Sequence, residues 1–357
     1  MRRLISAMQE DHVASKIADI QSPEEIPFAP SLREPMEFTD SYGNAFALQP
    51  GLREEIKPGW RAMFDAKDFI RIPESEEIDG RVSAAEASVK AFISHLVAMG
   101  YTCANQDMLE IGCFDGSRTY ALAQTGGRSV VGSDLSRYYV AQFDGAKVTH
   151  KEISQTEYEL SILRNAIRKG FESNIAEPGW TERVSFIEDD IAASSISDAS
   201  FDVIVSWEVL EHVLNPETMF TRLYSLLRPG GITFHEYNPF FALNGGHSLC
   251  TLDMLWGHAW LSDMDFQRYV QSVRPNEADV AIRFFTENLN RMTLADLRTF
   301  GRNAGLELIS FIPWNSRRAA ELINNDVIRQ AKNLYSSVTV EDFLVDTVWV
   351  AWRKPPS

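Results

Sequence analysis

The segment 108–117 constrains the fold of this chain more than any other. Its apolar run is interrupted by one acid, Glu110, and leads into a turn with Gly112 and Gly116, directly followed by a helical pattern over 118–124. This order predicts a buried strand, a glycine turn and a helix, which is how a doubly wound α/β sheet presents a nucleotide-like ligand. Glycines allow the backbone to approach a ligand closely, and the free N–H groups of the new helix face it. A tight turn with no ligand is the alternative at this point.

Acidic residues end several further strands that the sequence predicts. Buried strands are expected at 129–134, 184–191, 201–208 and 232–237, with a helix over 216–227 before the last of them. The first of these ends at Asp134, whose carboxylate can accept both hydroxyls of a ribose. The carboxyl ends of parallel strands share one edge of an open α/β sheet, where such sheets bind ligands. The sequence therefore predicts a row of acids along a ligand-binding edge.

Residues 108–237 resemble the class I S-adenosylmethionine (SAM)-dependent methyltransferases, with the core motifs in order. The segment 110–116 resembles the first motif, although Phe114 stands where the family usually has a glycine. Asp134 matches the ribose-binding acid, and Asp190, twelve residues before Asp202, matches the acceptor of the adenine amino group. Since the outer two glycines of the motif are in place, we expect the loop to work with slightly altered packing.

The resemblance also implies the fold and the cofactor. It implies a Rossmann-like, doubly wound α/β sheet of seven strands, mostly parallel with an antiparallel last strand, and 306–313 and 347–353 resemble the closing pair. It implies a turn at 227–231 before the fifth strand. It also implies SAM rather than NAD, because dehydrogenases lack the segments 201–205 and 227–231. The residues implied to contact SAM are Glu110, Gly112, Cys113, Phe114, Gly116, Asp134, Leu135, Asp190, Ile191 and Trp207.

The composition agrees with a cytoplasmic, soluble enzyme. Apolar residues make up 45% of the 357 residues, which is ample for a sizeable core. No run approaches the roughly 18 apolar residues of a membrane span, and the apolar stretch near residue 5 is too short for a signal peptide. Three cysteines cannot build a disulfide framework, so we expect reduced thiols, with Cys113 as a small buried side chain in the glycine motif.

The net charge of −16 argues against nucleic acid as a partner. Proteins that bind polyanions need a basic face that releases counterions. Arg164, Arg168 and Lys169 cluster on one predicted helix, either as a local basic patch or as an ordinary solvated helix face. A small-molecule acceptor is therefore favoured, with neither nucleic acid nor membrane as a partner.

The chain divides into four predicted parts. These are an N-terminal extension (1–80), the SAM-binding core (81–237), an insertion that binds the acceptor (238–290) and the C-terminal part of the core (291–357). The extension is rich in proline and glutamate, with short helices expected near 3–19 and 59–67. It could form a lid over the site, a surface decoration or a homodimer contact.

Three helices within these parts are marked by local patterns. Residues 83–86 form a capping box before a helix that Gly100 closes. Leu160, Leu163, Ile167 and Phe171 are spaced as one face of a helix in the long connection 137–183. Residues 293–296 open a further helix after the insertion.

The insertion holds an unusual number of aromatic residues. They include Phe240, Phe241, Trp256, Trp260, Phe266 and Tyr269. Members of the family often place acceptor specificity after the fifth strand, which favours an aromatic-lined acceptor pocket. The alternative is that these side chains form the insertion's own small core.

Methyl transfer to oxygen requires a base or a metal to remove the acceptor's proton. The candidate catalytic residues are His212, which follows the fourth strand, and His247 and His258 in the insertion. The spacing of Glu208, Glu211 and His212 resembles that in ubiquinone-biosynthesis O-methyltransferases and small-RNA 2′-O-methyltransferases, and this resemblance implies that the three residues hold Mg²⁺. Relatives without a metal share the same residues at 208–212, so a simple histidine base is favoured. We expect a SAM-dependent methyltransferase that acts on a small molecule at oxygen, with a non-catalytic SAM-binding module as the alternative.

Overall fold

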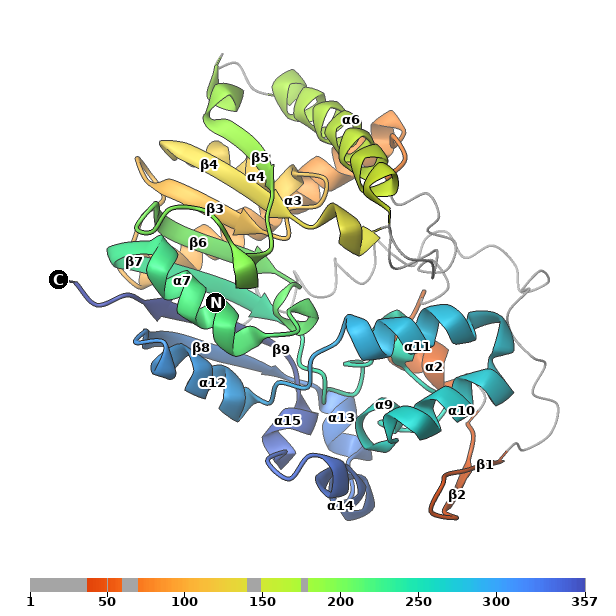
Figure 1. Cartoon of the computed structure of the whole chain (residues 1–357). Helices are drawn as coiled ribbons and strands as arrows, with labels where there is room; N and C mark the ends of the chain where they lie inside the picture. Colours follow the sequence, from red (N-terminus) through yellow and green to blue (C-terminus); the bar gives the residue numbers. More distant parts are fainter. Residues whose placement is uncertain (1–36, 50, 60–69, 140–148, 175–178, 357) are drawn as a thin grey trace.

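A seven-stranded sheet forms the centre of the computed structural model, which describes residues 37–49, 51–59, 70–139, 149–174 and 179–356 (Figure 1). The spatial order is β5 (Val184–Glu188), β4 (Ser129–Asp134), β3 (Asp107–Ile111), β6 (Phe201–Trp207), β7 (Leu227–Tyr237), β9 (Val345–Arg353) and β8 (Glu307–Asn315). Neighbours from β5 to β7 are parallel, whereas β9 is antiparallel to both β7 and β8. The expected doubly wound sheet with an antiparallel last strand is confirmed.

The strand order reverses between β3 and β6. From β3 the chain proceeds through β4 to β5 on one side, and it then returns to place β6 on the other side of β3. Ligands bind in open α/β sheets outside the carboxyl ends of the strands at such a switch point. The glycine turn after β3 and Glu208 after β6 lie at this place.

Helices cover both faces of the sheet (Figure 1). On one face lie α3 (Ser75–Ala98), α4 (Ser117–Ala123) and α6 (His150–Asn174), and on the other lie α7 (Pro216–Leu226) and α12 (Leu294–Asn303). The alternation of strand side chains produces this arrangement, since Met108 packs with the first group of helices and Leu109 with the second. In α6, the four apolar residues of the predicted face are all fully buried.

The start of α3 differs from the prediction. The helix begins at Ser75, so the supposed capping box at 83–86 lies in its interior, and the boundary between residues 80 and 81 falls inside it as well. The apolar face extends towards the N-terminus, because Ile78 and Val82 pack over Gly170 of α6. Gly100 follows the helix end with φ of 86°, as expected for the residue after a helix.

Two other local predictions have different outcomes. Residues 228–231, expected as a turn, form the irregular first part of β7, where the register with β6 shifts and Gly230 donates to the carbonyl of Lys354. The helix after the insertion begins as predicted, because Thr293 and Asp296 form a complete capping box at the start of α12.

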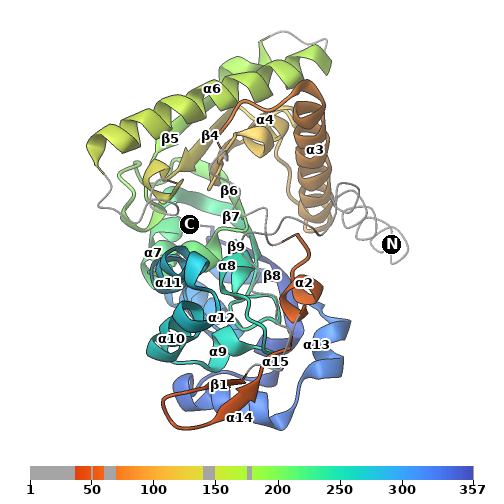
Figure 2. The ribbon, with the colours of Figure 1, turned by 90° about the vertical axis from the view of Figure 1, so that its right-hand side faces the viewer.

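A second lobe packs below the sheet in Figure 2. Its elements are β1 (Glu37–Thr39), β2 (Ala45–Ala47), α2 (Leu52–Ile56), α8 (His247–Cys250), α9 (Gly257–Trp260), α10 (Asp263–Val273), α11 (Ala278–Glu287), α13 (Arg317–Leu322), α14 (Asn325–Leu334) and α15 (Val340–Leu344). These elements come from three stretches of sequence, 37–56, 247–287 and 317–344, and one apolar core joins them. The six aromatic residues named above are all buried in this core. The expectation that they line a pocket is therefore wrong, because the lobe needs them to hold its three stretches together.

The described part of the N-terminal extension is tied to the insertion. Gln49 N–H donates to the carbonyl of Asp253 at 2.7 Å, and Arg53 forms a buried ion pair with Glu277 at 2.8 Å. The expected helix at 3–19 and nearly all of that at 59–67 lie outside the described residues. Across the described ranges, each helix is too short or too polar to cross a membrane.

Candidate functional site

The glycine turn after β3 requires glycine at both outer positions. Gly112 has φ of 71°, and a Cβ there would lie 2.3 Å from Cγ2 of Val209. Gly116 has φ of 76°, and a Cβ there would lie 2.5 Å from the ring of Phe186. The close approach of the turn to neighbouring side chains therefore depends on these two residues.

Phe114, the departure from the family motif, is held from two sides. It adopts a left-handed conformation with φ of 42°, which is strained for a residue with a Cβ. Its N–H donates to Oδ2 of Asp134 at 2.5 Å, and its carbonyl accepts from Nε of Arg164 at 2.8 Å. Its ring packs against Tyr139, with centroids 5.2 Å apart. These contacts keep the turn in place without the usual glycine.

Asp134 ends β4 beside the glycine turn, as predicted. Its side chain is 8% exposed and accepts hydrogen bonds from the N–H of Phe114, the N–H of Leu135 (2.7 Å) and the hydroxyl of Tyr139 (2.9 Å). Burial raises the pKa of Asp134, against the opposing effect of these donors. The structure thus brings together the carboxylate expected to bind ribose and the glycine motif.

Glu110 and Cys113 lie beneath the turn. The Glu110 carboxyl is buried and accepts from the Thr119 hydroxyl of α4 at 2.5 Å, and burial raises its pKa to about 8. Burial also raises the pKa of the Cys113 thiol well above its ordinary value, so this side chain is a packing group and not a nucleophile. All three cysteines are free and buried.

The remaining cofactor candidates lie along the same edge. Asp190 follows β5, is exposed, and accepts from the N–H of Ala192, while Ile191 beside it is buried. Trp207 ends β6 and is buried under the guanidinium of Arg118, which lies 5.4 Å from the ring centroid.

His212 occupies a short 3₁₀ helix, Leu210–His212, directly after β6. Its Nδ1 lies 2.7 Å from the carbonyl oxygen of Asn288. A carbonyl can only accept, so Nδ1 carries the proton, and Nε2 of the neutral ring has the free lone pair. Burial lowers the pKa of His212, which favours the neutral form.

Aromatic rings from three segments surround His212. Tyr138 lies at 5.5 Å between ring centroids, and His247 and Phe284 each lie at 5.7 Å. His247 has a left-handed backbone with φ of 57°, and its Nδ1 is buried without a hydrogen-bond partner. Burial, the neighbouring His212 and Lys57 lower its pKa well below the ordinary value. The two histidines therefore form one neutral pair at the edge of the sheet.

His258 does not join this pair. It is 1% exposed, and its Nε2 is 3.0 Å from the carbonyl of Phe240 inside the second lobe. A base must reach the acceptor's proton, so the structure supports a packing role for His258 and corrects the catalytic assignment made from sequence.

Glu208, Glu211 and His212 do not form a metal-binding group in the structure. Among the described residues, no three His, Cys, Asp or Glu side chains are gathered in a way that could hold a metal ion. Glu208 is exposed and accepts from Nδ2 of Asn238, whereas Glu211 is 4% exposed and its Oε2 lacks a partner.

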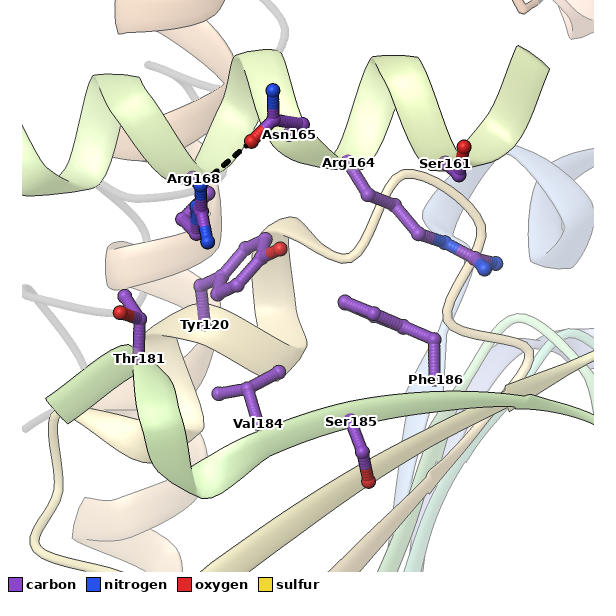
Figure 3. Close-up of a pocket in the computed structure, with 9 residues that line it drawn as sticks. All are labelled: Tyr120, Ser161, Arg164, Asn165, Arg168, Thr181, Val184, Ser185 and Phe186. Atoms are coloured by element: carbon purple, nitrogen blue, oxygen red, sulfur yellow. Dashed lines mark hydrogen bonds between the residues drawn. The ribbon is translucent and has the colours of Figure 1, made fainter. Parts of the chain in front are cut away.

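A surface pocket of about 410 Å³ lies between α6, the 3₁₀ helix Trp180–Arg183 and the start of β5 (Figure 3). Arg164 in it lies over the ring of Phe186 and donates to Phe114, and Arg168 pairs with Asn165 and with Glu172 at 3.7 Å. Both arginines of the predicted basic cluster thus contact other residues of the protein, and Lys169 is exposed, which favours the interpretation as an ordinary solvated helix face.

Sequence reasoning missed the residues that support the site from outside the motifs. Tyr138 and Tyr139 lie four and five residues after Asp134. Their closeness in sequence to a predicted site residue is the signal that would have identified them. Asn288 lies at the end of the insertion, 76 residues from His212, and no local pattern marks it.

Comparisons with known proteins agree with this geometry. The sequence model of the methyltransferase-domain family matches residues 83–310, which is more than half of the chain. A ubiquinone biosynthesis O-methyltransferase from Azoarcus sp. is 23% identical over 58% of this chain and 66% of its own length. The mitochondrial ubiquinone biosynthesis O-methyltransferase of Dictyostelium discoideum is 28% identical over 36% of this chain and 34% of its own length. The chain thus spans less than two thirds of either relative.

Among solved structures, a phosphoethanolamine N-methyltransferase 2 from Haemonchus contortus, in complex with S-adenosyl-L-methionine, is similar with a TM-score of 0.41 and 16% identity. The match covers 74% of this chain and 52% of that one.

Proposed function

The chain belongs to the methyltransferase-domain family, and from this premise we propose that it is a SAM-dependent methyltransferase that methylates an oxygen atom of a small-molecule acceptor. The residues at the edge fit the cofactor, because two obligatory glycines lie beside the buried carboxylate of Asp134 and the exposed carboxylate of Asp190. Asp134 would hold the ribose and Asp190 the adenine amino group. When bound, SAM supplies an electrophilic methyl group, and in-line displacement then depends mainly on positioning.

The observation that carries the proposal is the orientation of His212. The carbonyl of Asn288 holds its Nδ1–H and leaves Nε2 to accept a proton, which is the arrangement of an oriented general base. Tyr138 connects the two parts of the site, because it follows Asp134 by four residues and contacts the His212 ring. A hydroxyl acceptor placed near His212 would lose its proton to Nε2, whereas a neutral amine needs no such base before transfer.

Two further observations support a small acceptor and oxygen as the nucleophile. The net charge of −16 disfavours polyanions. Curated relatives include ubiquinone biosynthesis O-methyltransferases, which act at oxygen according to their names.

The test is a screen of small molecules that carry hydroxyl or amine groups, with labelled SAM and the purified chain. For the acceptor found, we expect His212→Ala to lower kcat by about 10²–10⁴-fold with unchanged affinity for S-adenosylhomocysteine. The exposed His150 provides a matched control, since His150→Ala should leave the rate unchanged. We also expect activity to fall as the pH drops through the lowered pKa of His212, because the protonated ring cannot act as a base.

Four outcomes would contradict this proposal. Transfer to nitrogen alone would exclude the oxygen assignment, and full activity in His212→Ala would make that residue structural. Loss of activity in a chelator, with recovery in Mg²⁺, would favour the metal alternative at Glu208, Glu211 and His212. Binding of SAM without transfer to any acceptor would favour a non-catalytic module.

A further inference from the structure

The carboxylate of Asp134 is nearly saturated with hydrogen bonds from the protein. An ionised carboxylate offers about two acceptor positions on each oxygen. Oδ2 accepts from the N–H of Phe114 at 2.5 Å and from the hydroxyl of Tyr139 at 2.9 Å, and Oδ1 accepts from the N–H of Leu135 at 2.7 Å. Oδ1 therefore retains one acceptor position, while both positions on Oδ2 are used.

A ribose presents two neighbouring hydroxyls. One of them donates a hydrogen bond to Oδ1 of such a carboxylate, and the other donates to Oδ2. Oδ2 can accept the second only if one of its present donors leaves. The N–H of Phe114 is part of the glycine turn, and Arg164 holds the carbonyl of the same residue at 2.8 Å. The hydroxyl of Tyr139 is at the end of a side chain that packs against the rings of Phe114 and Tyr138, so it can leave Oδ2 without a change in the backbone of the glycine turn.

We propose that Tyr139 competes with the ribose hydroxyls for Asp134 and thereby sets the affinity of this chain for adenosine-containing ligands. The inference rests on the proposed role of Asp134 in the cofactor site. Phe114 takes part, because its ring supports Tyr139 at 5.2 Å with an angle of 36° between the ring planes. The residue that replaces the family's glycine thus holds the competing hydroxyl at the carboxylate.

The competition predicts the direction in which the Tyr139 hydroxyl changes the affinity for the ligand. Binding of a ribose exchanges the bond from Tyr139 for a bond from the ligand, so the net worth of the Tyr139–Asp134 hydrogen bond is subtracted from the binding energy. Removal of the hydroxyl should therefore strengthen binding, whereas it should weaken binding if Tyr139 instead contacts the ligand. Tyr139 is a positioning residue in this scheme, since it acts through Asp134.

The experiment compares wild type with Tyr139→Phe in calorimetric titrations with S-adenosylhomocysteine. We expect the affinity of Tyr139→Phe to be about threefold to tenfold higher, as the net value of one hydrogen bond implies. Tyr158→Phe is the matched control, because Tyr158 lies on α6 with 62% exposure, and its affinity should equal that of wild type. An analogue that lacks both ribose hydroxyls should bind wild type and Tyr139→Phe equally.

Each result has a defined meaning. Unchanged or weaker binding of S-adenosylhomocysteine by Tyr139→Phe overturns the inference, and so does equal tightening of the analogue. Those outcomes leave the proposed function intact, because wild type still binds the ligand. Failure of wild type to bind S-adenosylhomocysteine would refute the cofactor site itself, and the competition with it. Circular dichroism and thermal unfolding of Tyr139→Phe would verify that the variant is folded.

Discussion

Glu211 makes the stability of this protein depend on pH in an unusual direction. It lies between β6 and α7 with 4% exposure, and its Oε2 lacks a hydrogen-bond partner. Burial, with a smaller contribution from the charge of Glu208, raises its pKa from 4.5 to about 8. The folded protein therefore keeps Glu211 protonated at neutral pH, whereas the unfolded chain releases this proton above about pH 4.5.

The sign and size of the effect follow from proton linkage. Between the unfolded and folded pKa values the folded state binds one more proton, so the free energy of unfolding falls as the pH rises. At about 1.4 kcal/mol for each pKa unit, this one group should reduce stability by roughly 2.5 kcal/mol between pH 5 and pH 7. Above about pH 8, where the folded state also releases the proton, the decline from Glu211 should end.

Glu211→Gln isolates this contribution, because the amide has nearly the same shape and does not titrate. We expect the free energy of unfolding of the variant, minus that of wild type, to grow by roughly 2.5 kcal/mol from pH 5 to pH 7 in urea titrations. The exposed Glu86 on α3 is the control, and Glu86→Gln should run parallel to wild type. Parallel curves for Glu211→Gln and wild type would refute the reasoning and show that Glu211 is ionised in the folded protein.

Three further predictions test the site and the lobe. Asp134→Ala should weaken SAM binding by about 1.5–3 kcal/mol in calorimetry, and undiminished binding would exclude a ribose contact. Gly112→Ala should destabilise the protein by about 1–3 kcal/mol, because the new Cβ would lie 2.3 Å from Val209; Val209→Ala in the same chain should recover part of the loss in thermal unfolding. Arg53→Ala should cost about 3–5 kcal/mol, since it removes the cation 2.8 Å from buried Glu277 and leaves the more distant Arg274 at 3.9 Å, and a change below 1 kcal/mol in urea unfolding would contradict this.

Much of the fold was predictable because its signals are local. The strands that follow from apolar runs agree with β3, β4, β5 and β6 to within a few residues. The helical face in α6 and the capping box of α12 were predicted for the same reason, since each depends on residues that are neighbours in sequence. The segment 228–231 differs from the predicted turn in being part of β7, where the register with β6 shifts and Gly230 donates to the carbonyl of Lys354.

The candidate site was predictable only in part. Position after a strand placed Asp134 and His212 at one edge, because the carboxyl ends of parallel strands meet there. The partners that give these side chains their chemistry come from elsewhere, as Asn288 does for His212. For His258 the sequence predicted a catalytic role, and only the packing of the second lobe shows that its ring is buried.

The amino-acid sequence by itself determined the strands of the central sheet, the glycine turn, the helices that cover the sheet and the order of acids along the edge, because periodicity and turn geometry are properties of adjacent residues. The tertiary structure decided which groups meet. Arg53 reaches Glu277 across 224 residues of sequence, and the aromatic side chains of the insertion became core because two other stretches of chain close over them. Such contacts depend on how the whole chain packs. The free energy of burial that selects them cannot be predicted from residues that are adjacent in sequence.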